Sequence, residues 1–158
     1  MRKGSRRVGR ETGAALVELA VVLPLLVLIM IGATDFARAF YFAMVLNNAA
    51  RAGAQYGAQS PTLSVDEPGM VAAAQASASA DIGTITVVTP IDHPCGCASD
   101  SNAWISTQPC ATVCPTGQHM VISVTVTTTA NFSRISPFPI PGIPQTFAIT
   151  RAATMRAQ

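Results

Sequence analysis

The apolar residues of this chain are distributed in two ways, as one unbroken run near the start and as alternating positions near the end. From Ala14 to Ala33 the twenty residues are apolar or small, except for Glu18. As a helix this run spans about 30 Å, the thickness of a bilayer's hydrocarbon core, whereas a run that began at Leu19 would span only about 22 Å. The pattern therefore predicts a transmembrane helix over residues 14–33, with Glu18 inside it or at its rim.

The helical pattern continues beyond the apolar run. Phe36, Phe40 and Met44 recur at every fourth position, which is a helical spacing. The simplest interpretation is one continuous helix over residues 14–58, about 66 Å long.

Small residues recur at the same spacing toward the end of this helix, where they allow another backbone to approach closely. They are expected to pack either on the protein's own sheet or on a partner subunit. Pro24 removes one backbone hydrogen bond and is expected to shape the helix. The residues that we expect to affect helix packing are Pro24, Gly32, Ala49, Gly53 and Gly57.

The remaining residues, 59–158, predict an α+β head. An Ala-rich segment at 70–80 suits a second, shorter helix, and residues 84–89 read as a strand. Alternating apolar and polar positions at 120–132 and 146–155 predict two further strands. We therefore expect an antiparallel sheet of about three strands packed on the C-terminal half of the long helix.

Charge is concentrated at the N-terminus. The chain of 158 residues is only 11% charged, against roughly 25% in typical soluble domains. Residues 1–13 carry five positive charges and one negative, while residues 14–158 carry five positive and seven negative. The net charge of +2 is thus a property of the leader and gives no support for nucleic-acid binding. A basic leader before the apolar run predicts a cytoplasmic N-terminus and an extracytoplasmic head.

Two other interpretations of the N-terminal segment remain open. One is a secretory signal peptide cut after Ala39, which would release a soluble domain, although signal h-regions usually run about 7–15 residues. The other is an uncleaved anchor whose Glu18 lies near the headgroups.

The junction between leader and apolar run carries a family resemblance. Gly13 followed by Ala14, with Glu18 as the fifth residue after the glycine, resembles a type IV prepilin processing site. The longer run GAALVELAVVLPLL resembles the TadE-like family of pseudopilins from tight-adherence (Flp, type IVb) pilus systems. The similarity covers about residues 12–56 and continues through Gly32, Asp35–Arg38 and Asn48–Ala54.

The resemblance implies a partner and a location. Its members are cut after the glycine by a membrane-embedded prepilin peptidase, so residues 1–13 would be a cleaved leader. It implies a single-pass protein of the bacterial inner membrane that meets other pilin or pseudopilin subunits in pilus assembly, secretion or adhesion. Cleavage would free an amine at Ala14 that can neutralise Glu18 of a neighbouring subunit, because intramembrane charges are expected to pair. A rim glutamate without a partner is the alternative.

The four cysteines form one cluster within residues 95–114, on the extracytoplasmic side. An even count in an oxidising compartment predicts two disulfides. The nested pairing Cys95–Cys114 with Cys97–Cys110 and the crossed pairing Cys95–Cys110 with Cys97–Cys114 both remain possible. A zinc site flanked by His93 and His119 is the functional alternative, but the spacings C-x-C and C-x3-C are unusual for zinc. Trp104 is expected to form the small core of this loop, with an exposed contact residue as the alternative.

Catalytic motifs are not found in the sequence. It has no phosphate-binding glycine loop, no Ser/His/acid set and no redox C-x-x-C motif. We therefore expect a structural protein that is not an enzyme and needs no cofactor. The main alternative from another class is an uncleaved, membrane-anchored binding or adhesion module that uses the cysteine loop as its contact surface.

Overall fold

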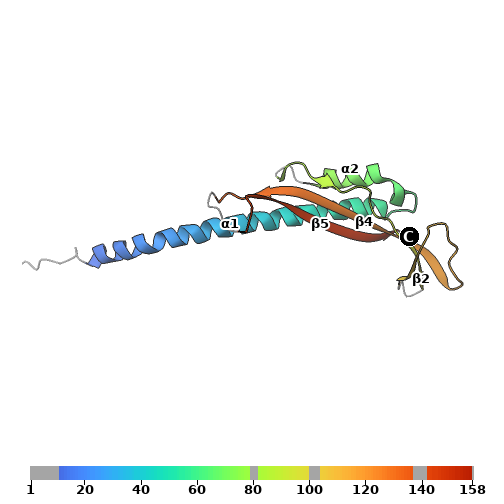
Figure 1. Ribbon diagram of the computed structural model, residues 1–158, viewed down its shortest axis with the longest axis horizontal. Coiled ribbons are helices and arrows are strands. Elements are labelled where there is room, and N and C mark those ends of the chain that lie inside the picture. Colours follow the sequence, from blue (N-terminus) through green and yellow to red (C-terminus); the bar gives the residue numbers. More distant parts are fainter. Residues whose placement is uncertain (1–10, 79–81, 100–103, 137–141, 158) are drawn as a thin grey trace, which may run out of the picture.

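One long helix projects far beyond a small α+β head, as Figure 1 shows. The computed structural model describes residues 11–78, 82–99, 104–136 and 142–157. Helix α1 runs without interruption from Glu11 to Gly57, with Pro24 inside it. It begins three residues before the expected start and ends one residue before the expected end, so the predicted long helix and the α+β class are confirmed.

In the part of the head that the structure describes, there are two short helical segments and five strands. The elements after α1 are η1 (Leu63–Val65), α2 (Glu67–Ser77), β1 (Thr86–Val87), β2 (Cys95–Ser99), β3 (Trp104–Gln108), β4 (Gln118–Ser133) and β5 (Thr146–Ala157). The expected count of about three strands was too low, because β2 and β3 arise from the cysteine segment, which lacks an alternating pattern. Helix α2 starts earlier than expected because the Asp66 side chain accepts a hydrogen bond from Gly69 N and caps it.

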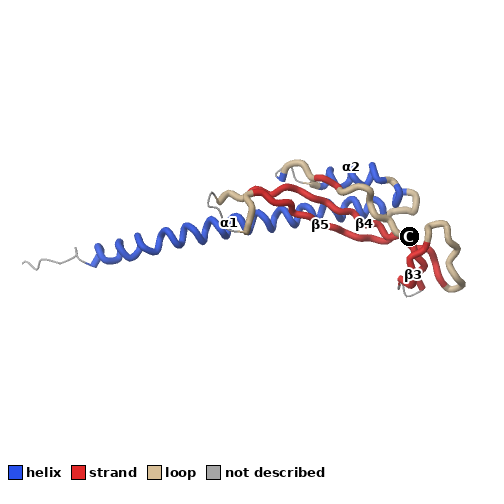
Figure 2. Tube along the Cα trace, viewed as in Figure 1, coloured by secondary structure: helices blue, strands red, loops and turns tan. Residues whose placement is uncertain are grey.

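Strand β4 is the centre of the sheet, and all strand pairings are antiparallel. From Ile122 to Ser133 it pairs with β5, from Ala157 back to Thr146. On its other edge, β1 pairs near one end and β2 near the other, with β3 beyond β2. Figure 2 shows the β2–β3 hairpin at the end of the head that lies away from the free part of α1.

The core lies between the second half of α1 and the sheet. Leu46 and Phe132 are almost completely buried in one cluster, and Met70, Val124 and Val126 in a second. The Thr128 hydroxyl, also buried, donates to the Leu46 carbonyl at 2.9 Å and ties β4 to the helix. Because alternate β4 side chains point at α1, the strand predicted from alternation is the one that carries the core.

The small residues of α1 pack inside the protein's own head. A Cβ added at Gly53 would lie 3.0 Å from the Met70 carbonyl oxygen and 3.1 Å from Val126 Cγ1. One added at Gly57 would meet the Met70 sulfur, and Ala49 is fully buried. The small residues were expected to pack either on the protein's own sheet or on a partner subunit. The structure places the protein's own sheet, together with α2, against them.

Candidate functional site

The start of α1, from Gly13 to Met30, projects away from the described part of the head. Every side chain described from Gly13 to Met30 is exposed, although nearly all are apolar. A Cβ added at Gly13 or Gly32 would meet nothing within 4 Å, and Pro24 is exposed as well. By length and composition this helix can cross a membrane, and the most apolar part of it is entirely exposed. The protein thus has one apolar N-terminal helix compatible with a single-pass anchor.

The expected processing residues lie near the exposed start of α1. Gly13, Ala14 and Glu18 are all in helical conformation and exposed. Because Glu18 is four residues after Ala14, the two lie on one face, about 6 Å apart along the axis. Helical side chains lean toward the N-terminus, so the Glu18 carboxylate leans toward the amine that a cut after Gly13 would create. Among the described residues, Glu18 has no hydrogen-bond or ion-pair partner in its own chain.

Asp35 ties the end of the apolar run to the head. Its side chain is buried and accepts hydrogen bonds from Ile135 N at 2.8 Å and Ser136 N at 3.0 Å. Arg38 Nη1 lies 3.6 Å from the same carboxylate. The backbone N–H of Ile135 is the main cause that holds the pKa of Asp35 below its usual value, with smaller contributions from Ser136, Arg38 and Arg134 against opposing desolvation. A carboxylate on α1 thus fixes the segment that follows β4.

A second set of hydrogen bonds closes the base of the β4–β5 connection. Arg134 donates from Nε to the Pro144 carbonyl at 3.1 Å and from Nη2 to the Ile143 carbonyl at 3.2 Å. Gln145 Nε2 donates to the Ser136 carbonyl at 3.1 Å. The base is therefore hydrogen-bonded on both sides, while residues 137–141 lie outside the described residues.

The cysteines form two disulfides at the opposite end of the head. Cys95 pairs with Cys110 and Cys97 with Cys114, which is the crossed arrangement; the nested pairing is wrong. The cysteines do not all lie in one loop as expected, because Cys95 and Cys97 are buried on β2. The zinc alternative requires free thiolates, and here all four sulfurs are paired with one another.

The two histidines that flank the cysteines in sequence differ in burial. His93 is half-buried, with Nδ1 2.9 Å from the Ile91 carbonyl oxygen, and His119 is exposed on β4. Among the residues that the structure describes, no cluster of His, Cys, Asp or Glu is suited to a metal ion. The prediction for the Trp104 side chain lies outside the described side chains.

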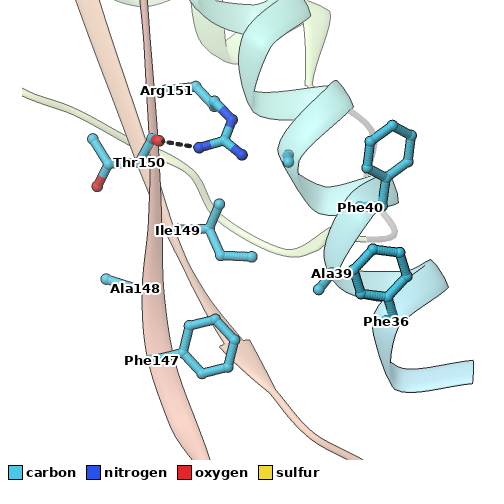
Figure 3. Close-up of a pocket in the computed structure, with 9 residues that line it drawn as sticks. Phe36, Ala39, Phe40, Phe147, Ala148, Ile149, Thr150 and Arg151 are labelled. Carbon is cyan, nitrogen blue, oxygen red and sulfur yellow. Dashed lines mark hydrogen bonds between the residues drawn. The ribbon is translucent and has the colours of Figure 1, made fainter. Parts of the chain in front are cut away.

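A groove beside β5 was not predicted from the sequence. Figure 3 shows it between α1 and β5, with Phe36 and Phe40 on one side and Phe147, Ile149 and Arg151 on the other. The open groove encloses about 380 Å³. Phe36 is 74% exposed and Phe40 58%, although both are large apolar residues. Their helical spacing was visible in the sequence, but their exposure was not.

The groove ends at a sheet edge that is free in the described structure. Strand β5 pairs with β4 alone among the described strands, which leaves the polar groups of its other edge available to pair with another chain. Arg151 Nη1 donates to the outward carbonyl of Thr150 at 2.9 Å. A charged side chain on an edge strand is a known way to oppose unwanted strand addition.

Comparison with known proteins identifies the helix and leaves the head without a match. A family model described as TadE-like protein matches residues 13–55, which cover the first half of α1 and nearly all of its packed half. No curated protein and no solved structure matches the chain significantly. The family match supports a component associated with the Tad pilus.

Proposed function

Because residues 13–55 form a TadE-like domain, we propose that this protein is a pseudopilin-like subunit of a Tad (Flp, type IVb) pilus or a related secretion machinery. It is cut after Gly13 by a prepilin peptidase and acts as a structural or assembly component, not as an enzyme. The observation that carries the proposal is the exposed apolar surface of α1 over residues 13–30, which we call the bare half of α1. The Gly13–Ala14 junction lies at its exposed start.

The bare half of α1 supports assembly because its side chains have no partner within the described head. An apolar surface of this length is stable only in lipid or against other apolar helices. Before processing, the basic leader holds the helix across the inner membrane with the head outside. After processing, the same surface can exchange lipid for the helices of neighbouring subunits.

Glu18 gives this exchange a preferred register. An unpaired charged side chain at the membrane centre is costly, by about 3 kcal/mol on insertion scales and more in simulations of isolated helices. The new amine at Ala14 offers an opposite charge on its own helix and on each neighbour. Helices that align an amine with Glu18 are therefore favoured over those that do not. Glu18→Ala should enter the assembled complex less efficiently than wild type, and equal incorporation would show that the pairing idea is wrong.

The test of processing is the N-terminal residue of the mature chain. The full-length protein would be produced with and without a prepilin peptidase, and its N-terminus read by mass spectrometry. Peptidase-dependent appearance of Ala14 is expected, and Gly13→Leu should block it. A chain that keeps Met1 in the presence of an active peptidase would contradict the proposal and support a plain anchor, and a chain that starts at Phe40 would support a signal peptide.

The second candidate is an adhesion module that stays uncleaved. It is favoured by the end of the head that carries the two disulfides. There Val113, between Cys110 and Cys114, is 92% exposed. Two disulfides that hold a short apolar tip would suit a contact surface far from the membrane. This candidate predicts that binding to a surface survives Gly13→Leu and is lost with Val113→Asp.

A further inference from the structure

We propose that the base of the β4–β5 connection rests on the lipid of the extracytoplasmic leaflet, with Ile135 and Ile143 as its apolar contacts. The head would then lie against the surface of the membrane. The inference rests on α1 as a membrane anchor and does not depend on cleavage after Gly13 or on entry into a pilus.

The position of this loop base follows from the Asp35 hydrogen bonds. Asp35 is two residues beyond the apolar run that ends at Ala33, which is about 3 Å along the helix axis. The headgroup region on each side of the hydrocarbon core is about 5–8 Å thick. Since Asp35 holds the N–H groups of Ile135 and Ser136 at hydrogen-bonding distance, both residues lie at the level of the headgroups when residues 14–33 span. Figure 1 shows the end of β4 and the start of β5 beside α1 where the helix leaves the head.

The side chains at this level suit the lipid boundary. Ile135 is 59% exposed and Ile143 48%, even though their backbones are fixed by hydrogen bonds to Asp35 and Arg134. Phe36, one residue beyond Asp35, is 74% exposed. Three large apolar side chains, Ile135, Ile143 and Phe36, are therefore exposed at the membrane end of the head.

Two cations border these apolar residues. Arg38 lies beside Asp35 and donates to the Ser133 carbonyl at 3.3 Å, and Arg134 bonds the carbonyls of the loop base. Arginine side chains commonly place their apolar stems along hydrocarbon and their charged ends among headgroups. Of the two, Arg38 is the one that can reach headgroups, because its side chain is 39% exposed whereas Nη1 of Arg134 is buried.

Continuity with the anchor favours lipid over a second protein as the occupant. Every side chain described from Gly13 to Met30 is exposed, so the anchor of a single copy is surrounded by lipid on all sides. Ile135 and Ile143 extend that apolar surface to the level of Asp35, just beyond Ala33. A single anchored copy therefore reaches lipid with this loop base without any partner subunit.

Tryptophan fluorescence in brominated lipid tests the proposal on the full chain. The protein has one tryptophan, so Trp104→Phe provides a silent background into which Ile143→Trp is introduced. The protein would be reconstituted into vesicles of phosphatidylcholine and phosphatidylglycerol, with bromines either near the headgroups or near the chain ends. The matched control is Val113→Trp, at a position 92% exposed in the cystine end of the head.

The expected result is a blue-shifted emission at position 143 that is quenched most strongly by bromines near the headgroups. Position 113 should emit as in water and remain unquenched. Ile135→Trp in the same background gives an independent second position, with quenching expected there as well. Water-like, unquenched emission at both 135 and 143 would overturn the proposal. A blue shift without bromine quenching would also overturn it, since it would identify a protein contact in place of lipid.

Discussion

The two halves of α1 belong to one continuous helix, yet their surroundings are opposite. In the first half, every side chain described from Gly13 to Met30 is exposed. In the second half, Leu46, Ala49 and Ala54 are completely buried against the head. The difference shows that apolar character alone does not say what a helix packs on. The half that packs inside the protein has small residues, such as Gly53 and Gly57, against side chains of α2 and β4. The other half carries large apolar residues on all sides and is suited to lipid or to other subunits.

The largest contrast is expected from truncating an apolar side chain in each half. Phe132→Ala should lower the free energy of unfolding by about 3–5 kcal/mol, because the ring is buried against the second half of α1. Leu26→Ala should leave it unchanged, since Leu26 is 48% exposed and belongs to neither core cluster of the described residues. Denaturant unfolding of both variants in detergent measures the contrast. Equal losses would contradict the division of α1.

Removal of one disulfide tests the stability of the head independently of α1. The double change Cys97→Ser and Cys114→Ser opens a loop with a sequence separation of 17 residues. The chain-entropy model gives a loss of about 3 kcal/mol. Denaturant unfolding should show this loss, while helicity in the first half of α1 stays constant by circular dichroism. Retained stability would mean that the hairpin folds without its cystine.

Glycine substitution gives a smaller effect with opposite signs in the two halves. Gly53→Ala places a methyl group against the Met70 carbonyl and Val126, so overpacking should outweigh the gain in helix propensity and leave a loss of about 1 kcal/mol. Gly32→Ala meets nothing within 4 Å and should be neutral or stabilising. Thermal unfolding compares the two variants. A loss at Gly32 would reveal a packing contact that the single chain lacks.

The boundary between the halves should respond to acid. Since the pKa of Asp35 is lower in the folded protein, its contribution to stability is present above the unfolded value of 3.8 and is lost as the pH falls through the folded value. Asp35→Asn should therefore lower stability at neutral pH and flatten the pH dependence below about pH 4. Hydrogen exchange at Ile135 N and Ser136 N gives the local readout. Unchanged protection in Asp35→Asn would contradict the assigned role of the carboxylate.

The sequence predicted the helix and the fold class because their signals are local. A largely apolar run of twenty residues, a spacing of four and the alternation over 120–132 can each be read without knowing the rest of the chain. The Gly13, Ala14 and Glu18 pattern was visible for the same reason, and the family match begins at Gly13.

The missing parts depend on contacts between distant residues. Asp35 accepts from residues 100 and 101 positions away, and nothing near it in the sequence indicates that. Strand β2 lacks alternation because Cys95, Gly96 and Cys97 are all buried. The crossed disulfides follow from the β2–β3 pairing, which places Cys95 opposite Gln108 and so brings Cys110 near it. Spacing alone permits either arrangement.

Photocrosslinking from the bare half of α1 tests the central claim most directly. A photoreactive residue at Leu25, which is 60% exposed, would be compared with one at Thr62, also exposed but on the head. In cells that contain the prepilin peptidase and the other pilus subunits, Leu25 should form adducts with those subunits that disappear with Gly13→Leu, and Thr62 should not. Adducts that persist when Gly13 is changed, or their absence in wild type, would contradict the claim that processing gives this half of α1 its partners.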